Sequence, residues 1–257
     1  MTKVGIKLGS EKLYRSLREF GFGSDSGLKL PGESKGILRP VSSWAQVDVA
    51  THSFGQGVAV TPLQMVRAMS VIANGGRLPR LRLVDSEPSE STRIISEGTA
   101  NTVREMLFGV VENEHGTGAK AAIEGVRIGG KTGTAQKARK DGRGYAPGAY
   151  IVSFLGFADA TGIGISKTLT LMVLVDEPRT KSNYGGTISA PIFQRIMQRS
   201  LHFISTRNEL KSSDPKSASN DSYMPTRFNS NRTTNRTNLN RTDENKEQGY
   251  LSAVYRQ

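Results

Sequence analysis

Apolar residues recur every three or four positions in four segments of the chain, which is the period of an amphipathic helix. These segments are 4–20, 61–75, 97–111 and 191–203. The second has the clearest boundaries, because Thr61 and Pro62 are preferred at the N-cap and the first position of a helix, and the pair Gly75-Gly76 ends one. The pattern therefore predicts four main helices, with a shorter helical segment at 119–123.

Between residues 126 and 175 the pattern changes to runs rich in β-branched and aromatic residues, separated by turns. Such runs predict strands, and here they cover 126–134, 150–157 and 169–175. The basic, glycine-rich segment 137–148 predicts an exposed hairpin connection, and 40–49, which carries Trp44, predicts a loop. We therefore expect an α+β fold, an α/β sandwich in which helices pack on an antiparallel sheet.

Composition divides the chain into two parts. Residues 1–205 resemble ordinary globular sequence, whereas 206–257 are rich in Ser, Asn, Arg and Thr and almost devoid of large aliphatic residues. A segment with so little apolar surface cannot offset its chain entropy on folding. We therefore predict one folded domain followed by a disordered, polar and basic tail.

The chain is strongly basic, with a formal net charge of +12 and a pI of about 10.0. Only a surplus of three positive charges lies in 206–257, so most of the excess belongs to the folded part. Such a balance favours anionic neighbours, nucleic acid among them. Because no RNA-binding aromatic pattern, zinc finger or clear helix-turn-helix accompanies it, we interpret the charge as a solvated basic surface and expect no nucleic acid partner.

Several other classes of site are disfavoured by residue usage. The chain has no Cys and only three His, widely spaced at positions 52, 115 and 202, so a metal site is not expected. No apolar run approaches the ~18–20 residues of a membrane span, and no signal-like segment follows Met1. If the protein acts outside the cytoplasm, we expect sequence other than this to take it there.

The candidate chemistry centres on Lys131-Thr132-Gly133-Thr134, late in a predicted strand and preceded by two glycines. A lysine on an edge strand can lower the cost of proton transfer and attract an anionic substrate. Gly133 leaves the strand face bare, so that a peptide can lie against the backbone as an added strand. Thr134 offers a hydroxyl to a carboxylate and a backbone N–H to a developing oxyanion.

These residues match the third motif of penicillin-binding proteins and serine β-lactamases. The rest of the chain resembles the class B, high-molecular-weight transpeptidases that cross-link peptidoglycan, in their C-terminal part only, over roughly Val4 to Ile204. The segments that carry the resemblance, in order, are Ser53-Phe54-Gly55-Gln56-Gly57, 60–64, Glu112 to Lys137 with Gly116-Thr117-Gly118, 150–156, 173–178, Tyr184-Gly185-Gly186 and 190–193. The long segment from Ser53 to Gln64 and the ending from Tyr184 to Phe193 favour a transpeptidase over a β-lactamase.

The resemblance implies a penicillin-binding, β-lactamase-like transpeptidase fold, incomplete at its N-terminus, and a role for each matched residue. Lys131 would help acylation, Thr132 and Thr134 would bind the substrate carboxylate, and the Thr134 N–H would be one oxyanion donor. Gln56 and Gln136 would line the cleft. The implied partners are D-Ala-D-Ala stem peptides and β-lactams, at the outer face of the bacterial cytoplasmic membrane, with no metal or organic cofactor.

Two further motifs of the family are not matched. No Ser-x-Asn occurs in the sequence, and the two Ser-x-x-Lys tetrads, at 26–29 and 213–216, stand in the wrong order for the fold. We interpret both tetrads as chance and expect this chain alone to be inactive, with Met1 an internal methionine of a longer protein or the gene broken. The alternative is a non-catalytic, split or degenerate piece that acts as a binding or scaffold module and docks the missing half. Such a piece would expose apolar faces of the 126–175 sheet and the 63–72 helix.

Overall fold

The computed structural model describes residues 1–84, 86–139, 141, 144–179 and 183–212. The helices are α1 (Thr2–Leu8), α2 (Ser10–Glu19), α3 (Gln46–His52), α4 (Pro62–Ala73), α5 (Glu97–Glu112) and α6 (Gly185–Ser212). Short 3₁₀ helices are η1 (Val41–Ser43), η2 (Ala119–Ala121) and η3 (Thr161–Ile163). The strands are β1 (Arg77–Pro79), β2 (Ser91–Arg93), β3 (Arg127–Ala138), β4 (Tyr145–Asp159) and β5 (Leu169–Asp176).

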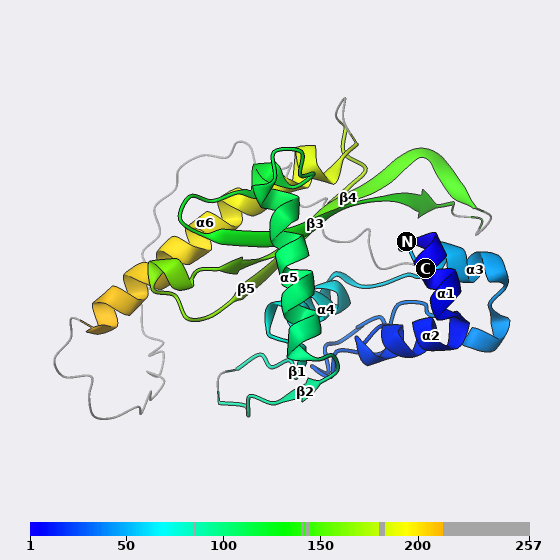
Figure 1. Cartoon of the computed structure of the whole chain (residues 1–257), viewed down its shortest axis with the longest axis horizontal. Helices are drawn as coiled ribbons and strands as arrows, with labels where there is room; N and C mark the ends of the chain where they lie inside the picture. Colours follow the sequence, from blue (N-terminus) through cyan, green and yellow to red (C-terminus); the bar gives the residue numbers. More distant parts are fainter. Residues whose placement is uncertain (85, 140, 142–143, 180–182, 213–257) are drawn as a thin grey trace, which may run out of the picture. The chain divides into compact units, whose positions relative to one another are not determined.

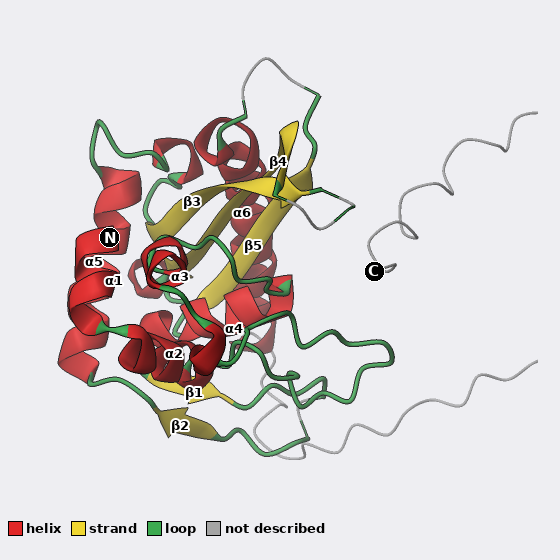
Figure 2. Cartoon of the chain, turned by 90° about the vertical axis from the view of Figure 1, so that its right-hand side faces the viewer, coloured by secondary structure: helices red, strands yellow, loops and turns green. Residues whose placement is uncertain are grey.

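The centre of the fold is an antiparallel sheet of β3, β4 and β5 in that order. Helix α6 covers one face, while α4 and α5 cover the other (Figures 1 and 2). Phe154 packs with Phe193 of α6 on the first face, and Phe157 packs with Phe108 of α5 on the second. This arrangement confirms the predicted α+β class and the antiparallel meander.

Gly129 and Gly130 are required by this packing. A Cβ on Gly130 would lie 2.5 Å from the ring of Phe154, and one on Gly129 would overlap the ring of Phe157. Each aromatic ring therefore lies directly over a strand residue without a side chain, one ring on each face of the sheet. The two glycines therefore let the rings of Phe154 and Phe157, which belong to β4, lie close against β3 just before Lys131.

The helix predictions were confirmed best where capping residues mark the ends. In α4 the Thr61 hydroxyl accepts from the Gln64 N–H, and the Gln64 side chain accepts from the Thr61 N–H, a reciprocal cap. The predicted 4–20 helix is instead two helices, because Gly9 adopts a φ of 85° between them. The segment predicted as helical at 119–123 is the 3₁₀ turn η2.

Three predictions about segments need correction. Part of the predicted loop 40–49 is helical, because the Asp48 carboxylate accepts the Ala45 N–H at 2.8 Å and stabilises the start of α3. Strands β3 and β4 extend into the predicted 137–148 connection. Helix α6 begins six residues before the predicted start, with Pro191 inside it, and the β1–β2 hairpin was not predicted.

The predicted boundary at 205/206 falls within α6, which continues to Ser212. The rest of the predicted tail lies outside the described residues, so the division into 1–205 and 206–257 stays a prediction. Within the described part, none of the helices combines the length and the apolar character needed to cross a bilayer.

Large apolar side chains are exposed chiefly outside α4. Helix α1 exposes Val4, Ile6 and Leu8, the sheet exposes Tyr145 and Leu174, and α6 exposes Ile192, Ile196 and Phe203. Among the described residues, no large apolar side chain of α4 itself is exposed. The expected exposure of the 63–72 helix was therefore wrong, because α5 and the sheet cover it. The exposed apolar side chains of the described residues are thus spread over α1, the sheet, α6 and several loops.

Candidate functional site

The Lys131-Thr132-Gly133 triplet lies in the middle of β3, which forms one edge of the three-stranded sheet in the described part of the chain. Directly paired residues of neighbouring strands share a face. Lys131 pairs with Leu155 and Thr132 pairs with Phe154, so Lys131 belongs to the α4–α5 face and Thr132 to the α6 face. The triplet therefore presents a lysine and a hydroxyl on opposite sides of one open strand edge.

Lys131 is exposed and makes no ion pair with any described residue. Its Nζ donates to the Thr132 carbonyl at 3.1 Å and lies 3.4 Å from Thr132 Oγ1. Lys137, six residues further along the strand, differs, because it bonds Glu177 at 2.6 Å and Asp176 at 3.0 Å, and these bonds raise its pKa. Of these two lysines on β3, Lys131 is the one whose charge is available to an anionic ligand.

Two threonines of the triplet region are held by neighbours on the α6 face. Thr132 Oγ1 lies 3.1 Å from Thr117 Oγ1, and Thr134 Oγ1 donates to the Asn183 carbonyl at 3.4 Å. Gly186 lies at the start of α6. A Cβ at this position would overlap the Thr117 carbonyl and lie 3.5 Å from Thr132 Cγ2. Thr117 belongs to the Gly-Thr-Gly segment of the sequence but was not predicted to have a role at the site.

Gly133 allows a close approach from the neighbouring strand. A Cβ at this position would lie 2.5 Å from Ser153 Oγ, the hydroxyl of its partner on β4. The Ser153 hydroxyl therefore occupies the space beside Gly133 on the same face as Lys131. Sequence reasoning did not find Ser153, since only the strand register brings it here.

The start of β3 is anchored to α5 by charge. Arg127 donates to Glu112 at 2.9 Å and to Glu105 at 3.1 Å, and its guanidinium lies 3.9 Å from the centre of the Phe108 ring. The bond to Glu112 is the main cause that raises the pKa of Arg127. These contacts hold the start of β3 against α5 and so help to fix the position of the triplet on this edge strand.

The remaining predicted site residues, Gln136 and Gln56, are less closely associated with the Lys131-Thr132-Gly133 triplet. Gln136 is exposed on β3 opposite Tyr150, on the same face as Thr132 and Thr134. Gln56 lies in the turn after α3, and in the described part no hydrogen bond joins its side chain to β3. The structure thus groups Lys131 to Thr134 with Gln136 and does not join Gln56 to them.

The two tetrads also have distinct positions. Ser26 is buried in a turn, where its hydroxyl accepts the Leu28 N–H at 3.2 Å, and Lys29 is exposed with a φ of 54°. This local role agrees with the interpretation of the 26–29 tetrad as chance. The 213–216 tetrad lies outside the described residues.

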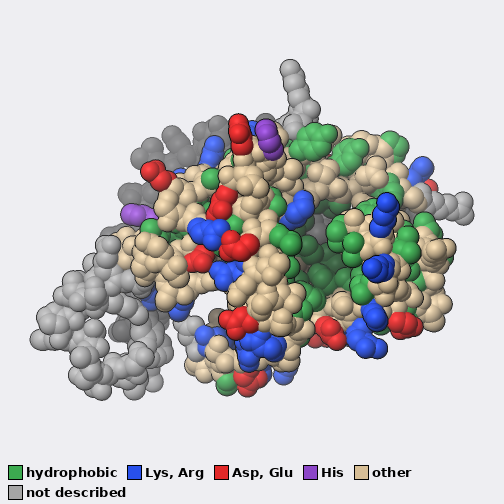
Figure 3. Space-filling view, in the orientation of Figure 1, with side chains coloured by type: hydrophobic (Ala, Val, Ile, Leu, Met, Phe, Trp, Pro, Cys, Tyr) green, Lys and Arg blue, Asp and Glu red, His purple; other side chains and the backbone are tan. Residues whose placement is uncertain are grey.

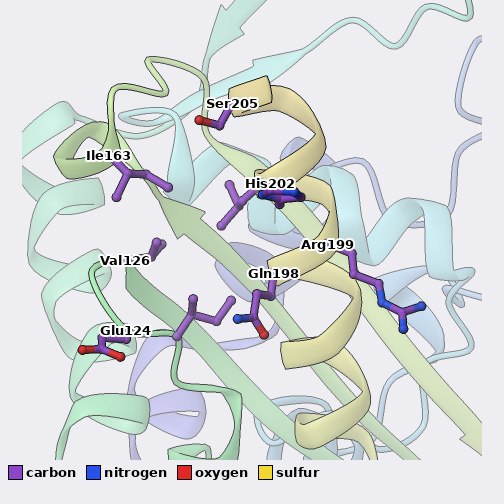
Figure 4. A pocket seen from close by; sticks show the side chains of 9 residues that line it. Glu124, Val126, Ile163, Gln198, Arg199, His202 and Ser205 are labelled. Carbon is purple, nitrogen blue, oxygen red and sulfur yellow. The ribbon is translucent and has the colours of Figure 1, made fainter. Parts of the chain in front are cut away.

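Figure 3 shows a hollow on the α4–α5 side of the molecule, between the part that carries β3 and α5 and the part that carries α1 and α3. Hydrophobic side chains surround it and basic side chains lie near its rim. A separate cavity of about 430 Å³ lies between α6, which contributes Gln198 and His202, and the segment with Val126 and Ile163 (Figure 4). That cavity contains none of the predicted site residues.

Comparison with known proteins identifies the class of this site. Residues 1–198 match the family model described as the penicillin binding protein transpeptidase domain. The chain therefore belongs to the penicillin-binding protein transpeptidase family, as its sequence motifs predicted.

Individual relatives agree with this assignment. Stage V sporulation protein D of Bacillus subtilis is 42% identical over 212 residues, covering 77% of this chain and 32% of the relative. The probable peptidoglycan D,D-transpeptidase PbpC of Pseudomonas aeruginosa is 37% identical, covering 78% of this chain and 34% of the relative. The chain thus spans about a third of the length of these curated relatives.

The solved structure of the transpeptidase domain of Burkholderia pseudomallei penicillin-binding protein 3 is 34% identical, with a TM-score of 0.69. The match covers 79% of this chain and 60% of that one. The fold described above is therefore that of a transpeptidase domain, over part of its length.

Proposed function

We propose that this chain forms the Lys-Thr-Gly wall of a peptidoglycan D,D-transpeptidase, which cross-links stem peptides through an acyl-serine intermediate. The observation that carries the proposal is the open edge of β3, where Lys131 has no anionic partner among the described residues and Thr132 and Thr134 stand on the opposite face of the same strand. The family of the chain and the printed activity of its relative PbpC support the same reaction.

Each residue of the strand has a distinct part in the proposed reaction. The stem peptide lies along the free edge of β3, where Gly133 removes steric hindrance, and its terminal carboxylate bonds Thr132 and Thr134. The charge of Lys131 assists proton transfer from the attacking serine. The serine oxygen bonds the carbonyl carbon of the penultimate D-Ala, the terminal D-Ala leaves as its protonated amine, and an acceptor amine then displaces the serine. Gln136 and Gln56 line the cleft.

The nucleophile of this reaction would come from sequence other than the 257 residues. No Ser-x-Asn is present, and Ser26 already satisfies a local turn. The hollow beside β3 and α1 is where we place the complementing part of the domain, with its nucleophile facing Lys131. By the same resemblance we place the assembled enzyme at the outer face of the cytoplasmic membrane. The chemistry as written uses no metal or organic cofactor.

A chimera tests the proposal directly. This chain replaces the matching C-terminal part of the Bacillus subtilis sporulation protein, to which it is 42% identical, and the product is incubated with a fluorescent penicillin. We expect covalent labelling at a serine of the B. subtilis part, and Lys131→Ala to slow it by about 100-fold, the usual effect of removing one electrostatic donor. The matched control is Lys137→Ala, because that lysine is already paired with acids, and it should label at nearly the normal rate.

Two outcomes would contradict the proposal. If a folded chimera shows no label while the unaltered B. subtilis protein does, then this chain cannot form the wall of the cleft. If the isolated chain is labelled without any complement, and Ser26→Ala removes the label, then the nucleophile has been misplaced.

A second candidate function is a non-catalytic binding module that docks a partner through its uncovered apolar surface. The exposed apolar residues of α1 favour it, because large uncovered patches of this kind mark interaction surfaces. The chimera discriminates the two, since a degenerate module would dock and fold but would not restore labelling.

A further inference from the structure

His52 is enclosed in the N-terminal helices in a way that no feature of the proposed reaction requires. It is the last residue of α3, and its side chain is only 5% exposed. Its ring lies 4.4 Å from the ring of Trp44, measured between centroids, and a Cβ on Gly57 would lie 2.8 Å from its Cε1. The imidazole is therefore held between the indole of Trp44 and the backbone of the 53–57 turn, which carries Gln56.

The polar atoms of this ring are poorly satisfied. Within the described part of the chain, Nε2 is buried and has no hydrogen-bond partner. Nδ1 lies 3.5 Å from Thr51 Oγ1, and a bond to the Asp48 carbonyl favours the protonated ring. A neutral imidazole can occupy such a site at moderate cost, whereas an imidazolium, which needs two acceptors, would have none at Nε2.

The charged groups that act on His52 do not remove this penalty. Asp48, on the same helix, favours the protonated ring, but its carboxylate already bonds Arg39 at 2.6 Å and the Ala45 N–H at 2.8 Å. Arg39 opposes protonation through its own charge. Burial is the largest effect and lowers the pKa of His52 below its ordinary 6.5.

We propose that His52 is a pH-sensitive latch, which holds the 53–57 turn against α3 when neutral and releases it when protonated. In its neutral form the ring fills the space between Trp44 and Gly57. Because the native state resists protonation, stability is highest above pH 6.5 and falls as the pH drops below 6.5 towards the lower native pKa. The proton is accommodated when the ring leaves its enclosure, and the turn with Gln56 moves with it.

The chain offers its own controls, because it contains one Trp and three His. His115 and His202 are both exposed, so the double variant His115→Gln/His202→Gln leaves His52 as the single histidine. Proton NMR of that variant follows the His52 ring directly between pH 8 and pH 4.5. The emission of Trp44 and the amide shifts of Gln56 and Gly57 are recorded over the same range in the full chain.

We expect one transition, with its midpoint below 6.5, in the ring signal, in the Trp44 emission and in the two amide shifts. His52→Phe, which keeps an aromatic ring of similar size without a titrating proton, should abolish the change in Trp44 emission, while the double variant retains it. His52→Gln provides the same comparison if the Phe variant does not fold. A midpoint at or above 6.5, a flat Trp44 emission, amide shifts that do not follow the ring, or an emission change that persists in the His52 variants would overturn the proposal.

Discussion

Gly186, the second residue of α6, lies where a side chain would collide with the support of the candidate site. A Cβ there would overlap the carbonyl oxygen of Thr117 and lie 3.5 Å from Thr132 Cγ2. Backbone oxygens cannot move aside as a flexible side chain can. Substitution by Ala must therefore displace either the start of α6 or the Thr117 segment that holds Thr132.

Gly98 provides a matched control, since it is the second residue of α5 and has no atom within 4 Å of its missing Cβ. In an open helical position, Gly→Ala stabilises a protein by about 0.5–1 kcal/mol. Forcing a methyl group into a packed contact costs about 1–3 kcal/mol. We therefore expect Gly98→Ala to raise the free energy of unfolding slightly and Gly186→Ala to lower it, the two variants differing by about 1–3 kcal/mol.

Thermal unfolding followed by circular dichroism measures this difference in the full chain. For a domain of this size about 1 kcal/mol corresponds to about 2–4 °C in Tm, so Gly186→Ala should melt well below Gly98→Ala. If the two variants are equally stable, then α6 does not approach the Thr117 segment as described, and the support of Thr132 has been misassigned.

Three further substitutions test the packing of the domain. Phe154→Ala removes a ring that is fully buried between β4 and α6, and it should lower the free energy of unfolding by about 3–5 kcal/mol. Phe203→Ala changes an exposed position of α6, so it should alter the free energy of unfolding by less than about 0.5 kcal/mol. Urea unfolding measures both values. Gln64→Ala removes the amide N–H groups that donate to the Ser24 and Lys35 carbonyls at 2.7 and 3.0 Å. It should lower the free energy of unfolding by about 1–3 kcal/mol. A change near zero would show that this buried amide does not connect α4 to the preceding loop.

The parts of the fold that sequence predicted well are those with local signals. Thr61 and Pro62 fix the start of α4, and alternating β-branched residues fix the three strands, because caps and periodicity depend on near neighbours. The start of α6 was misplaced for the same reason. Pro191 resembles a first-turn residue, but the chain is already helical at Gly185.

Contacts between distant segments could not be predicted in this way. The Lys131 triplet was found from its residues, whereas its position on an edge strand comes from the sheet order of the structure. The Thr117 hydroxyl beside Thr132 and the Ser153 hydroxyl beside Gly133 depend on the register of β3 with β4 and on the path of the chain after α5. Nor does the sequence show that Lys131 has no ion-pair partner among the described residues while Lys137 has two, since Asp176 and Glu177 come from the end of another strand.

The central claim is that Lys131 belongs to a working transpeptidase cleft, and penicillin labelling in the organism's own cells tests it most directly. Every product that contains peptides from 1–212 is captured with an antibody to this chain, labelled with a fluorescent penicillin and mapped by mass spectrometry. We expect a covalent label on a serine outside the 257 residues, in a product that loses most of its label when Lys131 is replaced by Ala. A complete absence of label on every such product, or full labelling of the Lys131→Ala protein, would contradict it.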